Sequence, residues 1–173
     1  MRLHLAPGSR VLIDLRATGL LRAVGHDPTL VARPEAMAID LGEGVLDVPV
    51  NARFRVDAIE PPADLSASDR EKMRDNLEGR DVLDAARYPV VELTGRYAGT
   101  VERGRLDAEL TIRGVPRRVA LDVQVIHEGQ VYVVTGAWQG KLTDLGIKPF
   151  KALMGALRLE DWARIRLDSR FVP

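Results

Sequence analysis

The sequence contains no cysteine, which excludes disulfides, thiolate metal sites and cysteine nucleophiles. It has only three histidines, and no two of His4, His26 and His127 have the spacing of metal ligands. It also lacks a Walker loop, a dinucleotide-binding fingerprint and a Gly-x-Ser-x-Gly motif. We therefore expect neither a metal site nor a cofactor, and the absences favour a protein that is not an enzyme.

An excess of charge of one sign is also missing. Lys and Arg together number 25, as do Asp and Glu, so the formal net charge is zero. A protein without net charge has no overall field that attracts polyanions, so we expect no nucleic-acid partner.

No apolar run approaches the ~20 residues of a membrane-spanning helix. The first residues break at Pro7 and have no apolar core, which is unlike a signal peptide. We expect a cytoplasmic protein with no integral membrane segment. The length of 173 residues, with 46% hydrophobic and 29% charged residues, is typical of one globular domain spanning residues 1–173.

What the sequence does contain is repeated alternation of apolar and polar residues, typical of strands with one dry and one wet face. In the first such segment Val11, Ile13 and Leu15 face one side, and Asp14 and Arg16 face the other. The alternating segments are residues 11–18, 35–41, 48–56, 90–94, 97–101, 106–112, 119–125, 131–138 and 162–171. Because many twisted strands tend to curl and close, the pattern predicts an all-β, roughly eight-stranded antiparallel barrel.

One segment, residues 66–79, has helical features. Ser68 with Glu71 fits a capping box, and Gly79 fits a C-terminal stop. The barrel should therefore carry one short helical insertion.

Two shorter signals concern the connections. Gly42-Glu43-Gly44 predicts a hairpin turn, and Pro49 predicts that its strand is bulged or at a sheet edge. Residues 148–159 fit either a short helix or a structured loop.

Four stretches in order along the chain resemble the YceI-like family, the lipocalin-like polyisoprenoid-binding barrels. They are Ile13-Asp14, Arg74-Asp75-Asn76-Leu77 leading to Tyr88-Pro89, Leu110-Thr111-Ile112-Arg113-Gly114-Val115, and Thr143-Asp144-Leu145-Gly146-Ile147. The chain departs from the family pattern at Ala17-Thr18, where members often have His-Ser, and at Asn76, where they have His. The resemblance implies a lipocalin-like barrel around a polyisoprenoid, quinone or fatty acyl ligand, and a homodimer.

The expected ligand-binding residues are mainly inward-facing aliphatic positions. Phe150 and Met154 belong to an apolar stripe at helical spacing, which fits core, a lid over the barrel mouth or a dimer contact. His26 is the candidate polar contact to a ligand head group. The full set is Ile13, Leu15, His26, Val50, Phe54, Leu110, Val133, Phe150, Met154 and Ile165.

Three functions remain open: a carrier with a ligand cavity, an enzyme that acts on a lipid, and a scaffold without a small ligand. The inward residues fill a small barrel by themselves, or they line a cavity. His26 beside Asp27 fits a proton shuttle in an enzyme that acts on a lipid, but Gly25 and Pro28 around them fit a simple turn. The third alternative is a scaffold without a small ligand.

Arg113, Arg117 and Arg118 fit a solvated face or a phosphate-binding patch.

Overall fold

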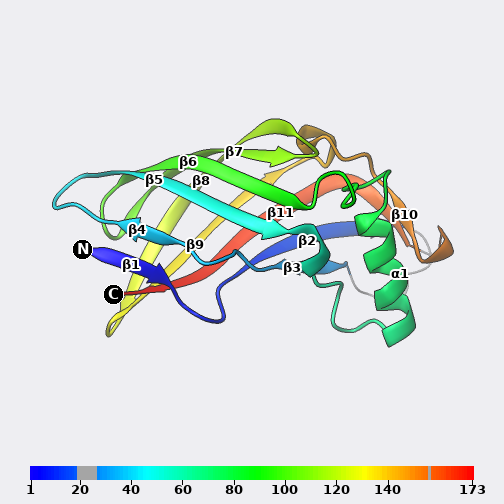
Figure 1. Cartoon of the computed structure of the whole chain (residues 1–173), viewed down its shortest axis with the longest axis horizontal. Helices are drawn as coiled ribbons and strands as arrows, with labels where there is room; N and C mark the ends of the chain where they lie inside the picture. Colours follow the sequence, from blue (N-terminus) through cyan, green and yellow to red (C-terminus); the bar gives the residue numbers. More distant parts are fainter. Residues whose placement is uncertain (19–26, 156) are drawn as a thin grey trace.

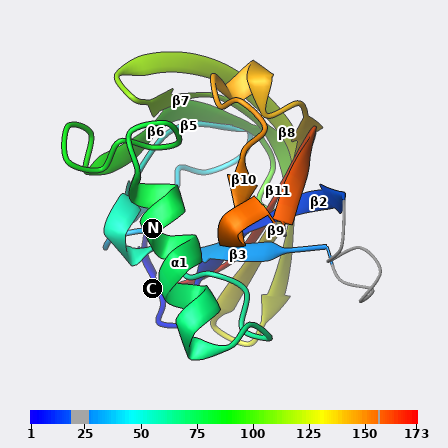
Figure 2. The same ribbon diagram turned by 90° about the vertical axis from the view of Figure 1, so that its right-hand side faces the viewer.

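The computed structural model describes residues 1–18, 27–155 and 157–173, and the strands of this part form one antiparallel sheet. Eight of them lie side by side in the order β3-β2-β11-β9-β8-β7-β6-β5, and the sheet curls strongly around its apolar face (Figure 1, Figure 2). The predicted all-β, lipocalin-like architecture with one short helix is therefore confirmed.

The eight strands of this path are β2 (Arg10–Thr18), β3 (Thr29–Ala32), β5 (Leu46–Arg55), β6 (Val90–Gly99), β7 (Arg103–Ile112), β8 (Val115–Glu128), β9 (Val131–Gly140) and β11 (Leu157–Val172). The remaining elements are β1 (Arg2–Leu5), β4 (Ala38–Asp40), β10 (Lys151–Ala152), α1 (Ala67–Glu78) and the 3₁₀ turns η2 (Val56–Ala58), η3 (Thr143–Leu145) and η4 (Leu153–Gly155). β1 pairs with both β11 and β4, and β10 pairs with β11.

The two ends of the path, β3 and β5, approach each other without forming a ladder. Val31 and Glu60 exchange two backbone hydrogen bonds of 3.0 and 2.8 Å, and Glu35 N–H donates to Arg53 O at 2.8 Å. Only these few hydrogen bonds are described between the two ends of the path, so the sheet is a half-barrel rather than a cylinder of continuous strand pairing.

Pro49 lies in β5, the strand at the free end of the path. β5 pairs with β6 in unbroken register from Leu46–Gly99 to Arg55–Val90. An edge strand tolerates a residue without a backbone N–H, because one of its sides makes no ladder. The prediction of an edge position for Pro49 is confirmed.

Helix α1 begins two residues earlier than the capping-box prediction requires. Ser66 is the N-cap, and its side chain accepts a hydrogen bond of 3.1 Å from the backbone N–H of Asp69. Met73 and Leu77 are buried on one face, and Gly79 is the C-cap as predicted. The helix is present, but the predicted role of Ser68 as its cap is wrong, because the helix begins at Ala67 and Ser68 lies in its first turn.

One other local prediction is wrong, and of the two alternatives for residues 148–159 the helix is excluded. The segment at Gly42–Gly44 is not a hairpin turn, because β4 pairs with β1, with Leu3 opposite Ile39, and not with β5. Residues 148–159 do not form one helix, because they divide into β10, η4 and the start of β11. Pairing with distant strands overrides the local signal in both places. No helix in the described part of the chain is long and apolar enough to cross a membrane.

Candidate ligand-binding cavity

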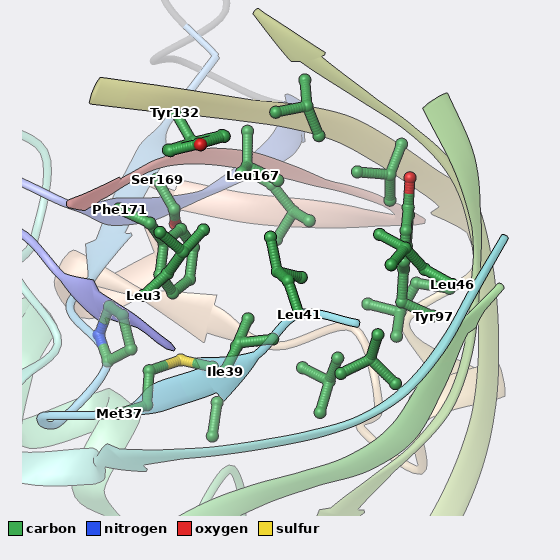
Figure 3. A pocket seen from close by; sticks show the side chains of 18 of the residues that line it. Leu3, Met37, Ile39, Leu41, Leu46, Tyr97, Tyr132, Leu167, Ser169 and Phe171 are labelled. Atoms are coloured by element: carbon green, nitrogen blue, oxygen red, sulfur yellow. The ribbon is translucent and has the colours of Figure 1, made fainter. Parts of the chain in front are cut away.

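The concave side of the sheet encloses a first cavity near the chain termini, with a volume of about 140 Å³. β1 and β4 lie across it, and they place Leu3 and Ile39 against side chains from the main strands (Figure 3). β11 contributes Leu167, Ser169 and Phe171, which alternate with outward residues because successive strand side chains point to opposite faces.

The few polar groups of this cavity are hydroxyls. Tyr97 O–H donates to the backbone O of Thr100 at 2.6 Å, and burial raises the pKa of Tyr97 above its ordinary value. Tyr132 O–H is 3.6 Å from the sulfur of Met1. Ser169 is 7% exposed, and its hydroxyl makes no hydrogen bond within the described residues. The Ser169 hydroxyl is therefore available to a polar group inside the cavity.

A second cavity, of about 150 Å³, occupies the end of the half-barrel nearer α1. Leu77 of α1 and Phe150 reach it from outside the sheet, and Ile13, Leu110 and Ile165 reach it from the strands. The indole N–H of Trp138 is the one side-chain polar group among its lining residues in the described chain. This end of the interior is therefore suited to hydrocarbon.

The two cavities adjoin along the barrel axis. Five residues line both of them: Val11, Phe54, Leu93, Leu106 and Leu167. Among the residues that the structure describes, neither lining contains an acidic or basic side chain, whereas the outer face of the sheet carries ion pairs such as Arg96–Asp47 at 2.8 Å. A flexible apolar chain therefore meets apolar walls along the whole interior.

Seven of the predicted ligand-binding residues line this interior. Val50 lines the first cavity, Phe54 lines both, and the second is lined by Ile13, Leu15, Leu110, Phe150 and Ile165. His26 lies outside the described residues.

The structure places the other two predicted residues elsewhere. Val133 lines neither cavity, because the inward side chains of β9 are those of Tyr132, Val134 and Trp138. β9 is apolar on both faces, so alternation alone leaves its orientation open. Pairing with β11 decides it, because Val134 lies opposite the inward residue Ser169.

Met154 is 95% exposed and lines neither cavity. The predicted helical stripe does not exist, because η4 interrupts the segment at this residue, where φ is 58°. The prediction left out many lining positions, and among these the polar ones include Tyr97, Tyr132 and Ser169. Ser169 gave no signal in the sequence, because a polar residue interrupts the apolar pattern of its strand.

Within the described residues, no group of three or more His, Asp or Glu side chains is arranged to hold a metal ion. The described side-chain groups that line the interior are hydroxyls, an indole, the thioether of Met37 and hydrocarbon, and they can make hydrogen bonds and apolar contacts. The chemistry that this arrangement supports is binding.

Comparison with known proteins identifies one family and several similar solved structures. Residues 35–171 match the model of the YceI-like domain. The crystal structure of Burkholderia cenocepacia BcnA superposes with a TM-score of 0.67 at 15% identity, covering 94% of this chain and 95% of that chain. The Campylobacter jejuni YCEI protein gives a TM-score of 0.46 at 17% identity, covering 68% of this chain and 67% of that one. No curated protein matches the sequence. With the family model covering most of its length, the chain belongs to the YceI-like family.

Proposed function

We propose that this protein binds a long apolar molecule of the polyisoprenoid, quinone or fatty acyl type inside the half-barrel and carries it without chemical change. The observation that supports this most strongly is the pair of adjoining cavities, whose described lining residues are all uncharged. An apolar chain of variable length fits such an interior better than a compact polar metabolite does.

The energetics of burial agree with this proposal. Each CH₂ removed from water contributes about 0.8 kcal/mol, so one five-carbon isoprene unit contributes about 4 kcal/mol before costs. Association costs roughly 4–15 kcal/mol, depending on the reference model. A few buried isoprene units are therefore enough for useful affinity, and the hydroxyl of Ser169 offers a hydrogen bond to a ligand oxygen.

The alternatives have less support. A scaffold filled by its own side chains does not require two cavities of about 140 and 150 Å³. An enzyme acting on the same ligand needs a general base in the interior, and the polar side chains that line the described interior are hydroxyls and an indole.

The first test is to purify the protein from its native host, extract it with organic solvent and identify the extract by mass spectrometry. We expect an apolar molecule in stoichiometric amount. A blank extract, followed by no binding of a panel of polyprenyl alcohols and quinones to the same preparation, would overturn the proposal.

Two neighbouring positions on β9 provide a variant test. Val134→Trp places a large ring in the first cavity, so we expect at least tenfold weaker binding of the ligand, a loss of about 1.4 kcal/mol. Val133→Trp is the matched control, because the side chain of Val133, the preceding residue on β9, lines neither cavity. Both affinities can be measured by tryptophan quenching with a quinone. Equal affinities of the two variants would contradict binding in this cavity.

A further inference from the structure

A third hollow lies outside the second cavity, at the end of the molecule that faces the viewer in Figure 2. It has a volume of about 920 Å³ and runs between the end of α1 and residues 146–151. Val82 and Phe150 line both this groove and the second cavity. The groove is therefore the outer side of the wall that closes the interior at this end.

The groove carries more positive than negative charge. Its cations come from four elements or loops and are Arg80, Arg113, Lys148 and Lys151, against the two carboxylates of Asp75 and Asp81. None of these six side chains forms an ion pair with another described residue. Some cations on the barrel wall, by contrast, form ion pairs, as in Arg166–Asp14 at 2.6 Å. The local field of the groove is therefore positive although the whole chain is formally neutral.

An exposed apolar side chain lies three residues after Lys151 of the groove. Met154 at η4 is 95% exposed, the highest exposure among the large hydrophobic residues that the structure describes. It follows β10, in which Lys151 lies opposite Arg158 of β11. Its φ of 58° is in the left-handed region, which is unfavourable for a residue with a side chain. A side chain that is 95% exposed in this strained conformation has no role in packing the half-barrel.

We propose that this end of the molecule docks on an anionic phospholipid surface, with Met154 entering the interface and Arg80, Arg113, Lys148 and Lys151 facing the lipid head groups. Each Lys or Arg near such a surface strengthens binding by about fivefold, and exposed apolar side chains add to this by burial at the acyl boundary. A lipid surface accepts both an unpaired cationic groove and an isolated apolar tip, whereas an acidic protein would have to match both in shape. Docking goes beyond ligand carriage, and it requires nothing to occupy the interior.

The test is cosedimentation of the full chain with vesicles, before and after organic extraction of the protein. We expect binding to phosphatidylglycerol-rich vesicles, much weaker binding to pure phosphatidylcholine vesicles, and release by high salt. The variant Lys148→Glu/Lys151→Glu should bind at least tenfold more weakly. The matched control is Arg103→Glu/Arg164→Glu, which changes the net charge equally at two exposed positions outside the groove.

Met154 provides an independent readout. The emission of Met154→Trp, after subtraction of the unsubstituted protein, should shift to shorter wavelength with anionic vesicles. Met154→Ser should weaken binding, whereas Ile126→Ser, a substitution of another exposed apolar residue on β8, should not. Equal binding to both vesicle types, or equal losses in the two charge-reversed variants, would overturn the proposal. Vesicle binding is measured without the ligand. Absence of vesicle binding would therefore leave the ligand-binding proposal intact, and absence of ligand binding would leave the docking proposal intact.

Discussion

Asp14 and Arg166 form the best-connected ion pair of the described chain, on the outer face where β2 meets β11. Arg166 donates two hydrogen bonds to the Asp14 carboxylate, at 2.6 and 2.8 Å, and Thr29 donates a third at 2.9 Å. The hydrogen bonds from Arg166 lower the pKa of Asp14 below its ordinary value, against the opposing effect of burial. The pair therefore connects β2, near the start of the sequence, with β11, near its end.

We expect Asp14→Asn to lower the free energy of unfolding by about 1 kcal/mol at neutral pH, the usual value of a partly exposed, hydrogen-bonded charge pair. Since the folded-state pKa is depressed, the contribution is complete above the unfolded-state pKa of about 3.9 and is lost as pH falls through the folded-state pKa. Urea unfolding at neutral and acidic pH measures this.

Asp40→Asn is the control for this change, because Asp40 is largely exposed and lies 3.9 Å from Arg2. It should have no measurable effect. A difference between unsubstituted and Asp14→Asn protein that stays constant into strong acid would contradict the assignment.

At the scale of the element, helix α1 depends on one cap. The Ser66 hydroxyl accepts from Asp69 N–H at 3.1 Å, while Ser68 lies within the first turn. We expect Ser66→Ala to cost about 1 kcal/mol of stability and Ser68→Ala to cost little. Thermal unfolding followed by circular dichroism distinguishes them. A larger loss in Ser68→Ala would restore the capping box that the sequence indicated.

The curl of the sheet depends on strand glycines that allow close approach. A Cβ added at Gly95 of β6 would lie 2.5 Å from the Cβ of Ala108, its partner in β7, and 2.6 Å from the backbone O of Asp107. Directly opposed Cβ atoms are normally about 4.5–5.5 Å apart. The two strands can approach this closely because Gly95 has no side chain.

Gly95→Ala should therefore lower the free energy of unfolding by about 1–3 kcal/mol through overpacking. Gly42→Ala is the comparison, because an added Cβ at Gly42 meets no atom within 4 Å. Urea unfolding of both variants is the measurement, and equal stability of the two would show that the strands separate at no cost.

At the scale of the whole molecule, the feature that matters is the continuity of the interior. Leu167 of β11 lines both cavities, at the level where they adjoin. A larger side chain there divides the interior, so a short ligand should still bind while a long one should not.

We expect Leu167→Trp to weaken binding of a long-chain polyprenyl quinone by at least tenfold, a loss of about 1.4 kcal/mol, and to leave a short-chain homologue nearly unaffected. Leu12→Trp, in the adjacent strand but outside both linings, should change neither affinity. Ligand-induced shifts in the melting temperature report both, because a ligand at a hundredfold its Kd stabilises the folded state by about 2.7 kcal/mol. Equal losses for both chain lengths would contradict a continuous site.

The alternation of apolar and polar residues was enough to predict most of the strands, the half-buried sheet and many of its inward residues. It did not indicate β1 or β3, and it divided β6 into two segments. This works because a strand's side chains alternate strictly between its faces, so Val11, Leu15 and Phe54 must lie inside together with their alternate neighbours. The edge position of Pro49 followed from its missing N–H in the same local way.

Only the tertiary structure decided what depends on partners distant in sequence. Val134 rather than Val133 faces the interior because β9 pairs with β11, and β4 pairs with β1 rather than completing a hairpin with β5. The cationic groove likewise gathers Arg80, Arg113 and Lys148 from separate loops. A local pattern fixes which face of a strand is dry, but the register between strands and the meeting of loops are set by the packing of the whole chain.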